Sequence, residues 1–150
     1  MTEKDINEPL QFGTQAPGEP YLDRPGVYGI AIDWHGRVLV ARVRQHLVLP
    51  GGGIDAGEDM EAALRREYRE ETGFKIQLLG PIGRANQFVR SYRDGTGYNK
   101  LCQFYRVELV GKQGPIAEPD HHPEWISLSQ AAENLMEEAH RWAIRKIQDS

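Results

Sequence analysis

Hydrophobic and polar positions in the first half of the chain follow a pattern that predicts β-strands. From Gly26 onward, the segments VYGIAIDW and RVLVARV are rich in apolar and β-branched residues, and the His35-Gly36 pair between them is typical of a turn. Together they predict a two-stranded hairpin. A short apolar segment, LVL, follows and predicts another strand, which ends at Pro50.

The pattern changes to a helical one after a run of glycines. The helix is predicted from about Glu58 to Thr72, and Gly73 follows at the position where a left-handed residue commonly ends a helix. Beyond it, the pattern predicts strands at 74–80, 85–92, 100–110 and 125–128, a turn at 93–97 and a polar loop at 111–123.

A second helix is predicted near the carboxyl end. Ser127 and Gln130 have the spacing of a capping box, so this helix begins near Ser127 or Ser129 and runs to about Ile147. Its apolar residues recur with a helical period and predict a face buried in the core: Ala132, Leu135, Met136, Ala139, Trp142, Ala143 and Ile147. Strands before, between and after two helices indicate an α/β (α+β) fold with helices packed on a mixed sheet.

The first 25 residues differ from the rest. They hold four of the nine prolines, namely Pro9, Pro17, Pro20 and Pro25, with little apolar periodicity. We therefore expect residues 1–25 to form an extended arm or tail. A chain of 150 residues accommodates one domain with a full core, so a single domain is expected at 26–150.

Composition and charge narrow the functional class. Hydrophobic residues make up 39% of the chain, and no apolar run approaches the roughly 18 residues of a membrane span, so a soluble protein with no membrane partner is expected. The net charge of −4 argues against binding duplex nucleic acid through its phosphates. A single cysteine, Cys102, and an amino terminus without the apolar core of a secretory signal make the cytoplasm the expected location.

The first predicted helix stacks like charges on one face. At about 100° per residue, Glu67, Glu70 and Glu71 fall within an arc of roughly 100°. A solvated charged helix is the alternative, and Glu61 with Arg65 at four-residue spacing fits it, but such pairs contribute only about 0.2 to 0.5 kcal/mol. They do not explain why Glu67 and Glu71 lie along the apolar stripe, where burial of an unpaired ion costs several kcal/mol.

A divalent cation is the simplest positive partner for these glutamates. Mg²⁺ takes oxygen ligands, usually one or two carboxylates, and completes its shell with water and substrate phosphate oxygens. Gly51, Gly52 and Gly53 come just before the helix. Since they lack Cβ atoms, their backbone approaches a ligand closely, and a helix amino terminus favours phosphate. The residues alone thus predict a site for a metal and a phosphate.

The segment GGIDAGEDMEAALRREYREETGF, residues 52–74, resembles the signature of the Nudix hydrolases. Its fixed letters are supplied by Gly52, Glu58, Arg66, Glu67, Glu70, Glu71 and Gly73. With residue frequencies of roughly 7%, a chance match has odds of about 10⁻⁸ per start position. Tyr68 and Phe74 depart from the aliphatic residues usual at their positions, which affects local packing more than chemistry.

The resemblance implies a Nudix-type α/β/α sandwich with the mixed sheet between helices. It also implies hydrolysis of a nucleoside diphosphate linked to another moiety, with Mg²⁺ or Mn²⁺ as cofactor. By position, Glu67, Glu70 and Glu71 would be metal ligands, joined by the Gly51 carbonyl. Glu58 would be an accessory acidic group and Arg66 would orient the glutamates.

The base that accepts a proton from water is left open by the resemblance. It is either Glu67 or an acid of the loop IAEPDHHPEW, where Glu118 is preferred over Asp120 and Glu124. His121 and His122 in the same loop are expected to be solvent-exposed rather than metal ligands.

The substrate is less defined. The glycines at 51–53 and Phe88 are expected to contact it; Tyr92, Tyr98 and Trp125 are further candidates for stacking, and Arg84, Arg90 and Arg93 for phosphate binding. Similarity to small bacterial mutator-type members suggests a nucleoside triphosphate, including oxidised ones, and allows a homodimer. The alternatives are a sensing or interaction module that has lost catalysis, and the isomerase branch of the fold, for which Cys102 would be the nucleophile.

Overall fold

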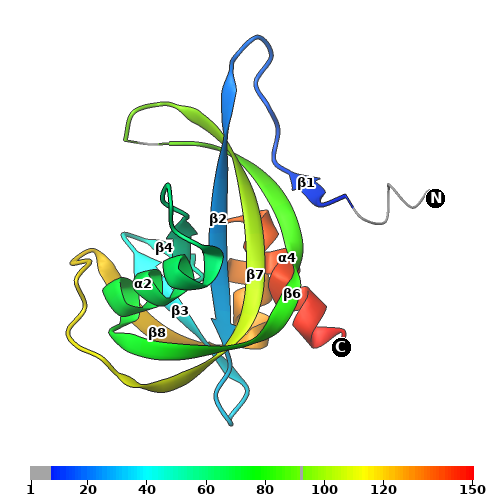
Figure 1. The fold of residues 1–150 in the computed structure, drawn as a ribbon. Coiled ribbons are helices and arrows are strands. Elements are labelled where there is room, and N and C mark those ends of the chain that lie inside the picture. Colours follow the sequence, from blue (N-terminus) through cyan, green and yellow to red (C-terminus); the bar gives the residue numbers. More distant parts are fainter. Residues whose placement is uncertain (1–7, 92) are drawn as a thin grey trace.

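The computed structural model describes residues 8–91 and 93–150, which form a mixed set of strands and helices (Figure 1). The strands are β1 (Leu10–Phe12), β2 (Tyr21–Ala31), β3 (Arg37–Val43), β4 (His46–Val48), β5 (Gly51–Gly53), β6 (Phe74–Arg90), β7 (Gly97–Lys112) and β8 (His121–Ser127). The helices are α2 (Met60–Thr72), α3 (Leu128–Asn134) and α4 (Glu138–Gln148).

The strands form two sheets that lie between the helices. One sheet has the order β1-β6-β7-β2-β5, with β1 parallel to β6 and β2 parallel to β7, and the other is antiparallel with the order β4-β3-β8. Val27, Leu39 and Leu64 share a core cluster on the α2 side, whereas Ile30 and Ile144 belong to the cluster on the α3 and α4 side. The predicted α/β/α sandwich is therefore confirmed.

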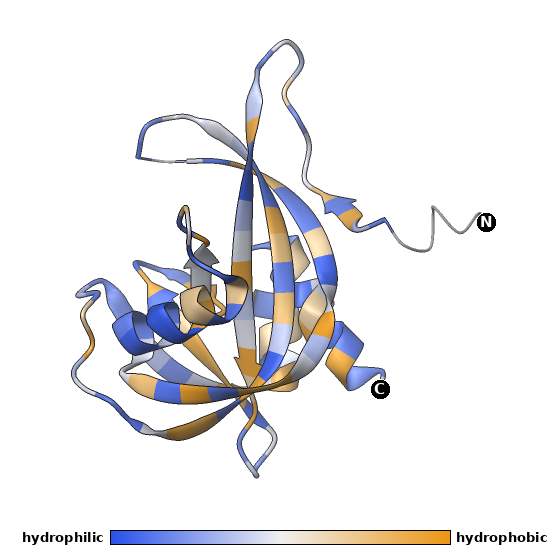
Figure 2. Cartoon of the chain, viewed as in Figure 1, coloured by the Kyte–Doolittle hydropathy of each residue, from blue (hydrophilic) through white to orange (hydrophobic). Residues whose placement is uncertain are grey.

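The core forms because successive side chains of a strand point to opposite faces. Along β2, Val27 and Ala31 pack toward α2, while Tyr28 and Ile30 pack toward α3 and α4. Figure 2 shows the corresponding alternation of hydrophobic and hydrophilic residues along β6 and β7. Among the described residues, no helix is long and apolar enough to cross a membrane.

The strand predictions need three corrections. The expected hairpin is wrong, because β2 and β3 belong to different sheets and the bridge Ile32–Val38 joins them. The segments at 74–80 and 85–92 are parts of one strand, β6, whose register against β7 shifts between Leu78 and Gly80 and at neighbouring positions. The glycine run is itself a strand, β5, paired with β2.

Helix α2 ends where the sequence indicates. Asp59 caps its amino terminus by accepting a hydrogen bond from the backbone N–H of Ala62 at 2.7 Å. Gly73 follows in the left-handed conformation with φ of 75°, and its N–H donates to the Arg69 carbonyl. This left-handed residue is the C-cap predicted from the glycine.

The closing helix is two helices rather than one. The predicted capping box of Ser127 and Gln130 is present at the start of α3. The helix then breaks because the backbone N–H of Met136 donates to the Leu47 carbonyl at 2.9 Å, which ties this part of the chain to β4. Leu135 is buried as predicted, whereas Met136 is 47% exposed and not part of the core.

The amino-terminal segment also carries strands. Strand β1 pairs with β6, and β2 begins at Tyr21, so it crosses the boundary expected between residues 25 and 26. Residues 1–7 of the expected arm lie outside the described part of the chain.

The position of Tyr68 on α2 depends on Gly29 of β2. Tyr68 is fully buried, and a Cβ at Gly29 would lie 2.6 Å from its Cε2 atom. The aromatic ring at this signature position is thus accommodated because the strand beneath it carries no side chain. Within the described part of the chain, the Tyr68 hydroxyl has no hydrogen-bond partner.

We expect Gly29→Ala to destabilise the protein by about 1 to 3 kcal/mol, the usual cost of overpacking a core. In a Tyr68→Leu background the same change should cost much less, because the tyrosine ring that would clash with the alanine Cβ is absent. Urea unfolding of the two single variants and the double variant measures this coupling. Gly80→Ala is the matched control, since a Cβ there would meet nothing within 4 Å. Fully additive effects would contradict the packing argument.

Candidate active site

Strand β5 and helix α2 bring the three glycines against the acidic face of the helix. A Cβ at Gly52 would lie 2.9 Å from Oε1 of Glu67, so this carboxylate sits directly over the strand backbone. Gly51 has φ of 148° and donates its N–H to Oε2 of Glu71 at 3.1 Å. A Cβ at Gly51 would come 2.2 Å from the Val27 carbonyl oxygen. Close approach to the backbone of β2 therefore requires glycine at position 51, whereas a side chain at position 52 would displace the Glu67 carboxylate.

The Glu67 and Glu71 carboxyls form a close pair, of which Glu71 is buried and Glu67 is partly exposed. Glu71 is 5% exposed, and its burial, together with the charge of Glu67, raises its pKa well above the usual value. Burial also raises the pKa of Glu67. Two carboxylates this close disfavour each other's ionisation, so a positive charge beside them stabilises their charged forms.

Arg66 connects the acidic residues on the solvent side of this pair. Its guanidinium donates to both oxygens of Glu58, at 2.7 and 2.9 Å, and to Oε1 of Glu67 at 2.8 Å. It also reaches Oε2 of Glu70 at 3.4 Å and the Gly53 carbonyl at 3.2 Å. The Arg66 hydrogen bonds lower the pKa of Glu58 to about 2, so Glu58 remains ionised at neutral pH.

The loop before β8 reaches the carboxyl end of the acidic helix. The backbone N–H groups of Ala117 and Glu118 both donate to the Glu70 carbonyl, at 2.8 and 3.0 Å. The negative charge of Glu118 contributes to the raised pKa of Glu71, which indicates that the Glu118 carboxylate lies near Glu71. Glu118 is itself exposed to solvent.

His121 is a site residue that sequence reasoning missed. Instead of lying in a solvated loop it begins β8, with its Nε2 atom 3.6 Å from Oε1 of Glu71. Burial lowers the pKa of His121. The signal was available: counting back from Trp125 by the two-residue period of a strand places Pro123 and His121 on the same face.

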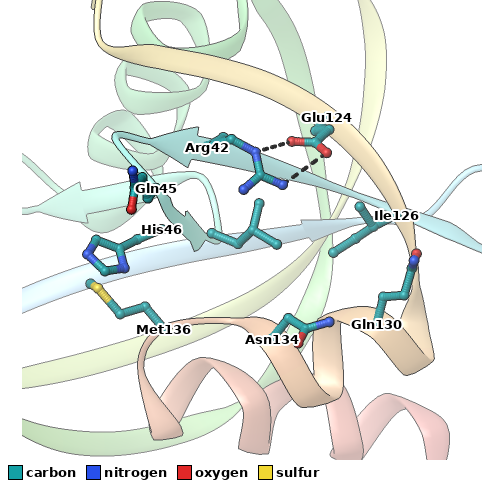
Figure 3. Close-up of a pocket in the computed structure, with 9 residues that line it drawn as sticks. Arg42, Gln45, His46, Glu124, Ile126, Gln130, Asn134 and Met136 are labelled. Atoms are coloured by element: carbon teal, nitrogen blue, oxygen red, sulfur yellow. Dashed lines mark hydrogen bonds and ion pairs between the residues drawn. The ribbon is translucent and has the colours of Figure 1, made fainter.

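The other loop acids lie elsewhere. Asp120 is exposed in the turn that precedes β8. Glu124 is on the opposite face of β8 from Trp125 and forms a two-bond ion pair with Arg42, at 2.8 and 3.2 Å. Figure 3 shows this pair in a cavity of about 410 Å³ beside α3, on the far side of the sheet from α2. The ion pair and its position make Glu124 a poor candidate for the base.

The candidate stacking residues are dispersed. Phe88 lies in β6 with its ring edge-on to Tyr21 at 5.3 Å. Tyr98 is covered by the Arg24 guanidinium at 5.3 Å, and Trp125 packs against the core cluster under α2. Tyr92 lies outside the described residues.

The candidate phosphate-binding residues Arg90 and Arg93 lie on or beside the turn between β6 and β7, and Cys102 is buried in β7. Arg90 forms an ion pair with Glu19 rather than with the signature residues Glu67, Glu70 or Glu71. Arg93 lies in the exposed turn between β6 and β7. Cys102 is buried, as expected, and its burial raises the pKa of its thiol to about 12.

A second cavity, of about 350 Å³, opens on the same face of the sheet as α2. Pro25, Asn86, Leu101 and Gln103 from β2, β6 and β7 line it, together with Arg84 and with Pro9 from the amino-terminal segment. Its walls come from strands that continue directly from the glycine strand β5.

The candidate metal ligands have the chemistry that a hard divalent cation prefers. Every candidate ligand is an oxygen atom, and the buried Glu71 carboxyl next to the charge of Glu67 favours a positive charge nearby. Across residues 8–91 and 93–150, however, no group of three or more His, Cys, Asp or Glu side chains is already arranged around a common point. Glu67 turns toward Arg66 and Glu71 toward the Gly51 N–H.

Comparison with known proteins agrees with this geometry. The sequence model of the NUDIX domain matches residues 22–147. An RNA pyrophosphohydrolase of Caulobacter vibrioides is 41% identical over 137 residues, which cover 75% of this chain and 77% of that protein. The nucleoside triphosphatase NudI of Enterobacter sp. is 45% identical over 65 residues, which cover 41% of this chain and only 43% of that enzyme.

Solved structures share the fold at low sequence identity. The NUDIX hydrolase from Nitrosomonas europaea superposes with a TM-score of 0.70 at 17% identity, covering 85% of this chain and 89% of that one. The MutT NUDIX hydrolase from Burkholderia pseudomallei gives a TM-score of 0.64 at 23% identity, covering 83% and 98%. With the domain match over most of its length and the signature residues gathered at one site, the chain belongs to the Nudix hydrolase family.

Proposed function

We propose that this protein is a Mg²⁺-dependent pyrophosphohydrolase that cleaves a nucleoside diphosphate linked to another moiety, with a nucleoside triphosphate as the leading substrate. The observation that carries the proposal is the grouping of the Glu67, Glu70 and Glu71 carboxyls beside the glycine strand, with Arg66 holding the first two. A buried carboxylate such as that of Glu71 costs several kcal/mol unless it is paired, so a bound cation accounts for its position.

The names of the relatives support the substrate class. One is called an RNA pyrophosphohydrolase and another a nucleoside triphosphatase, and both names denote hydrolysis at a nucleotide phosphate chain. The net charge of −4 argues against binding duplex nucleic acid through its phosphates and is compatible with a small nucleotide as the substrate.

Glu67, Glu70 and Glu71 would hold the metal, with the Gly51 carbonyl as a further ligand. When bound, a divalent ion supplies charge neutralisation at the phosphates and lowers the pKa of a bound water. The chain does the positioning. Arg66 fixes the direction of Glu67 and Glu70 and is itself held by the ionised Glu58.

Glu118 is the better placed of the two candidate bases. Glu67 already accepts a hydrogen bond from Arg66, whereas Glu118 is exposed to water near the pair. In the proposed reaction, water attacks phosphorus, its proton passes to the Glu118 carboxylate, and the bond from phosphorus to the leaving oxygen breaks.

The direct test is release of phosphate or pyrophosphate from a panel of nucleotides. The panel comprises nucleoside triphosphates, oxidised triphosphates, nucleotide sugars, ADP-ribose and dinucleoside polyphosphates, each with Mg²⁺, with Mn²⁺ and with a chelator. Chelator-sensitive hydrolysis of triphosphates supports the proposal. Silence across the panel would instead favour a Nudix-fold sensing or interaction module.

Loss of a metal ligand should abolish most turnover without unfolding the protein. We expect Glu70→Gln and Glu71→Gln each to lower kcat/KM by about 100-fold or more, because several kcal/mol of transition-state stabilisation depend on the metal. Steady-state kinetics with saturating Mg²⁺ measures the effect. Glu61→Gln is the control on the same helix, since Glu61 is exposed and pairs with Arg65. Normal turnover in both site variants would refute the assignment.

The raised pKa of Glu71 also predicts a pH dependence of stability. In the metal-free protein, the folded state retains a proton that the unfolded chain releases above the ordinary glutamate pKa of 4.5. The Glu71 contribution to the free energy of unfolding therefore falls as pH rises above that value. Glu71→Gln removes this contribution, so its stability advantage over the wild type should grow with pH.

Mg²⁺ reverses the effect, because the ion displaces the proton and binds more tightly as pH rises. Thermal melting of both proteins between about pH 5 and about pH 8, with and without Mg²⁺, tests both trends. Parallel pH profiles for the wild type and the variant would show that Glu71 titrates normally and would contradict the prediction.

A further inference from the structure

The cavity beside α2 is connected to the acidic site by a row of paired residues. Gly52 pairs with Val27, Val27 with Gln103, and Gln103 with Arg84, so one row crosses β5, β2, β7 and β6 on a single face. Adjacent strands lie about 4.8 Å apart, so Gln103 is about 10 Å from Gly52. Glu67 lies over Gly52, and the cavity is therefore within reach of a nucleotide held at the glutamates.

The cavity has the chemistry of a nucleobase site. Pro25 and Leu101 give it an apolar floor, and Asn86 and Gln103 place two carboxamides beside that floor. Each carboxamide offers a donor and an acceptor, and the described residues provide no hydrogen-bond partner for either. A carboxamide can bind the edge of a base through two hydrogen bonds and discriminate among bases.

The amino-terminal segment that contains β1 contributes Pro9 to the lining of this cavity, although it lies before residue 22, where the family match begins. It is anchored on both faces of the sheet. Phe12 packs against the core on the α4 side, and Gln11 exchanges two amide hydrogen bonds with Asn99 of β7, at 2.9 and 3.3 Å. Pro9, just before the strand, lines the cavity, and β1 forms the edge of the sheet beside β6 (Figure 1).

We propose that β1 is a specificity element that completes a nucleobase pocket, in which Asn86 and Gln103 bind the base edge of the substrate. This inference rests on the proposed function, since it assumes that the phosphates of the same nucleotide lie at the glutamates. It assigns a role to a segment outside the family domain. The larger cavity in Figure 3 cannot serve this substrate, because it lies on the opposite side of the sheet from α2.

The experiment compares kcat and KM for ATP, GTP, CTP and UTP in the full-length wild type and its variants. Gln103→Leu and Asn86→Leu remove the base contacts, Gln11→Leu loosens β1, and deletion of residues 2–13 removes it. The wild type should prefer one base over the poorest by at least about tenfold in kcat/KM, the discrimination expected of one two-bond base contact.

Each variant should reduce this preference to within about threefold, mainly by raising KM for the preferred base, while kcat at saturation stays within about twofold. Gln45→Leu is the control, because it changes a carboxamide in the other cavity. The point variants keep the test decisive if the deletion fails to fold.

The outcomes separate the two proposals. A wild type that hydrolyses all four nucleotides equally overturns the base pocket, and so does a preference that survives in all variants. If Gln103→Leu and Asn86→Leu lose the preference but Gln11→Leu and the deletion keep it, the role of β1 is overturned. No chelator-sensitive hydrolysis of any nucleotide overturns the proposed function itself, and the inference falls with it.

Discussion

The site depends on one unfavourable arrangement, the burial of the Glu67 and Glu71 carboxyls against each other and against the glycine strand. Burial and the nearness of the two groups raise the pKa of both carboxyls. The close approach of the carboxyls to strand β5 is possible because the glycines have no side chains. The Gly51 N–H also stabilises Glu71 with a hydrogen bond. In the proposed function, a divalent ion would neutralise this pair of acids.

The central strand β2 links this acid pair to the rest of the molecule. It pairs with the glycine strand β5 on one side and with β7 on the other, so the strand beneath Glu67 and a strand that lines the second cavity share one neighbour. Gly29 in the same strand makes room for Tyr68, which holds α2 close to the sheet. Packing and chemistry therefore depend on the same backbone.

The sequence was sufficient to locate α2, its C-cap Gly73 and the signature residues, because helical period and spacing are local properties. The hairpin prediction was wrong because the local sequence does not indicate that β2 pairs with β7 rather than with β3. One closing helix was predicted instead of two, because the hydrogen bond from Met136 to Leu47 interrupts a sequence whose helical pattern is continuous. His121 was overlooked because two prolines and a run of polar residues obscured the start of β8. In each case a distant contact overrode the local pattern.

The parallel pairing of β2 with β7 has a consequence for the order of folding. It joins Tyr21 to Gly97 and continues to Ala31 and Val107, so most of the chain must be present before the central strand gains its second neighbour. Contacts between residues so far apart in sequence form slowly, since a long loop must close first. During synthesis, the acidic helix emerges well before the strand that completes the sheet beneath it. The nascent chain is therefore expected to remain inactive and to expose an unpaired strand edge until β7 has left the ribosome.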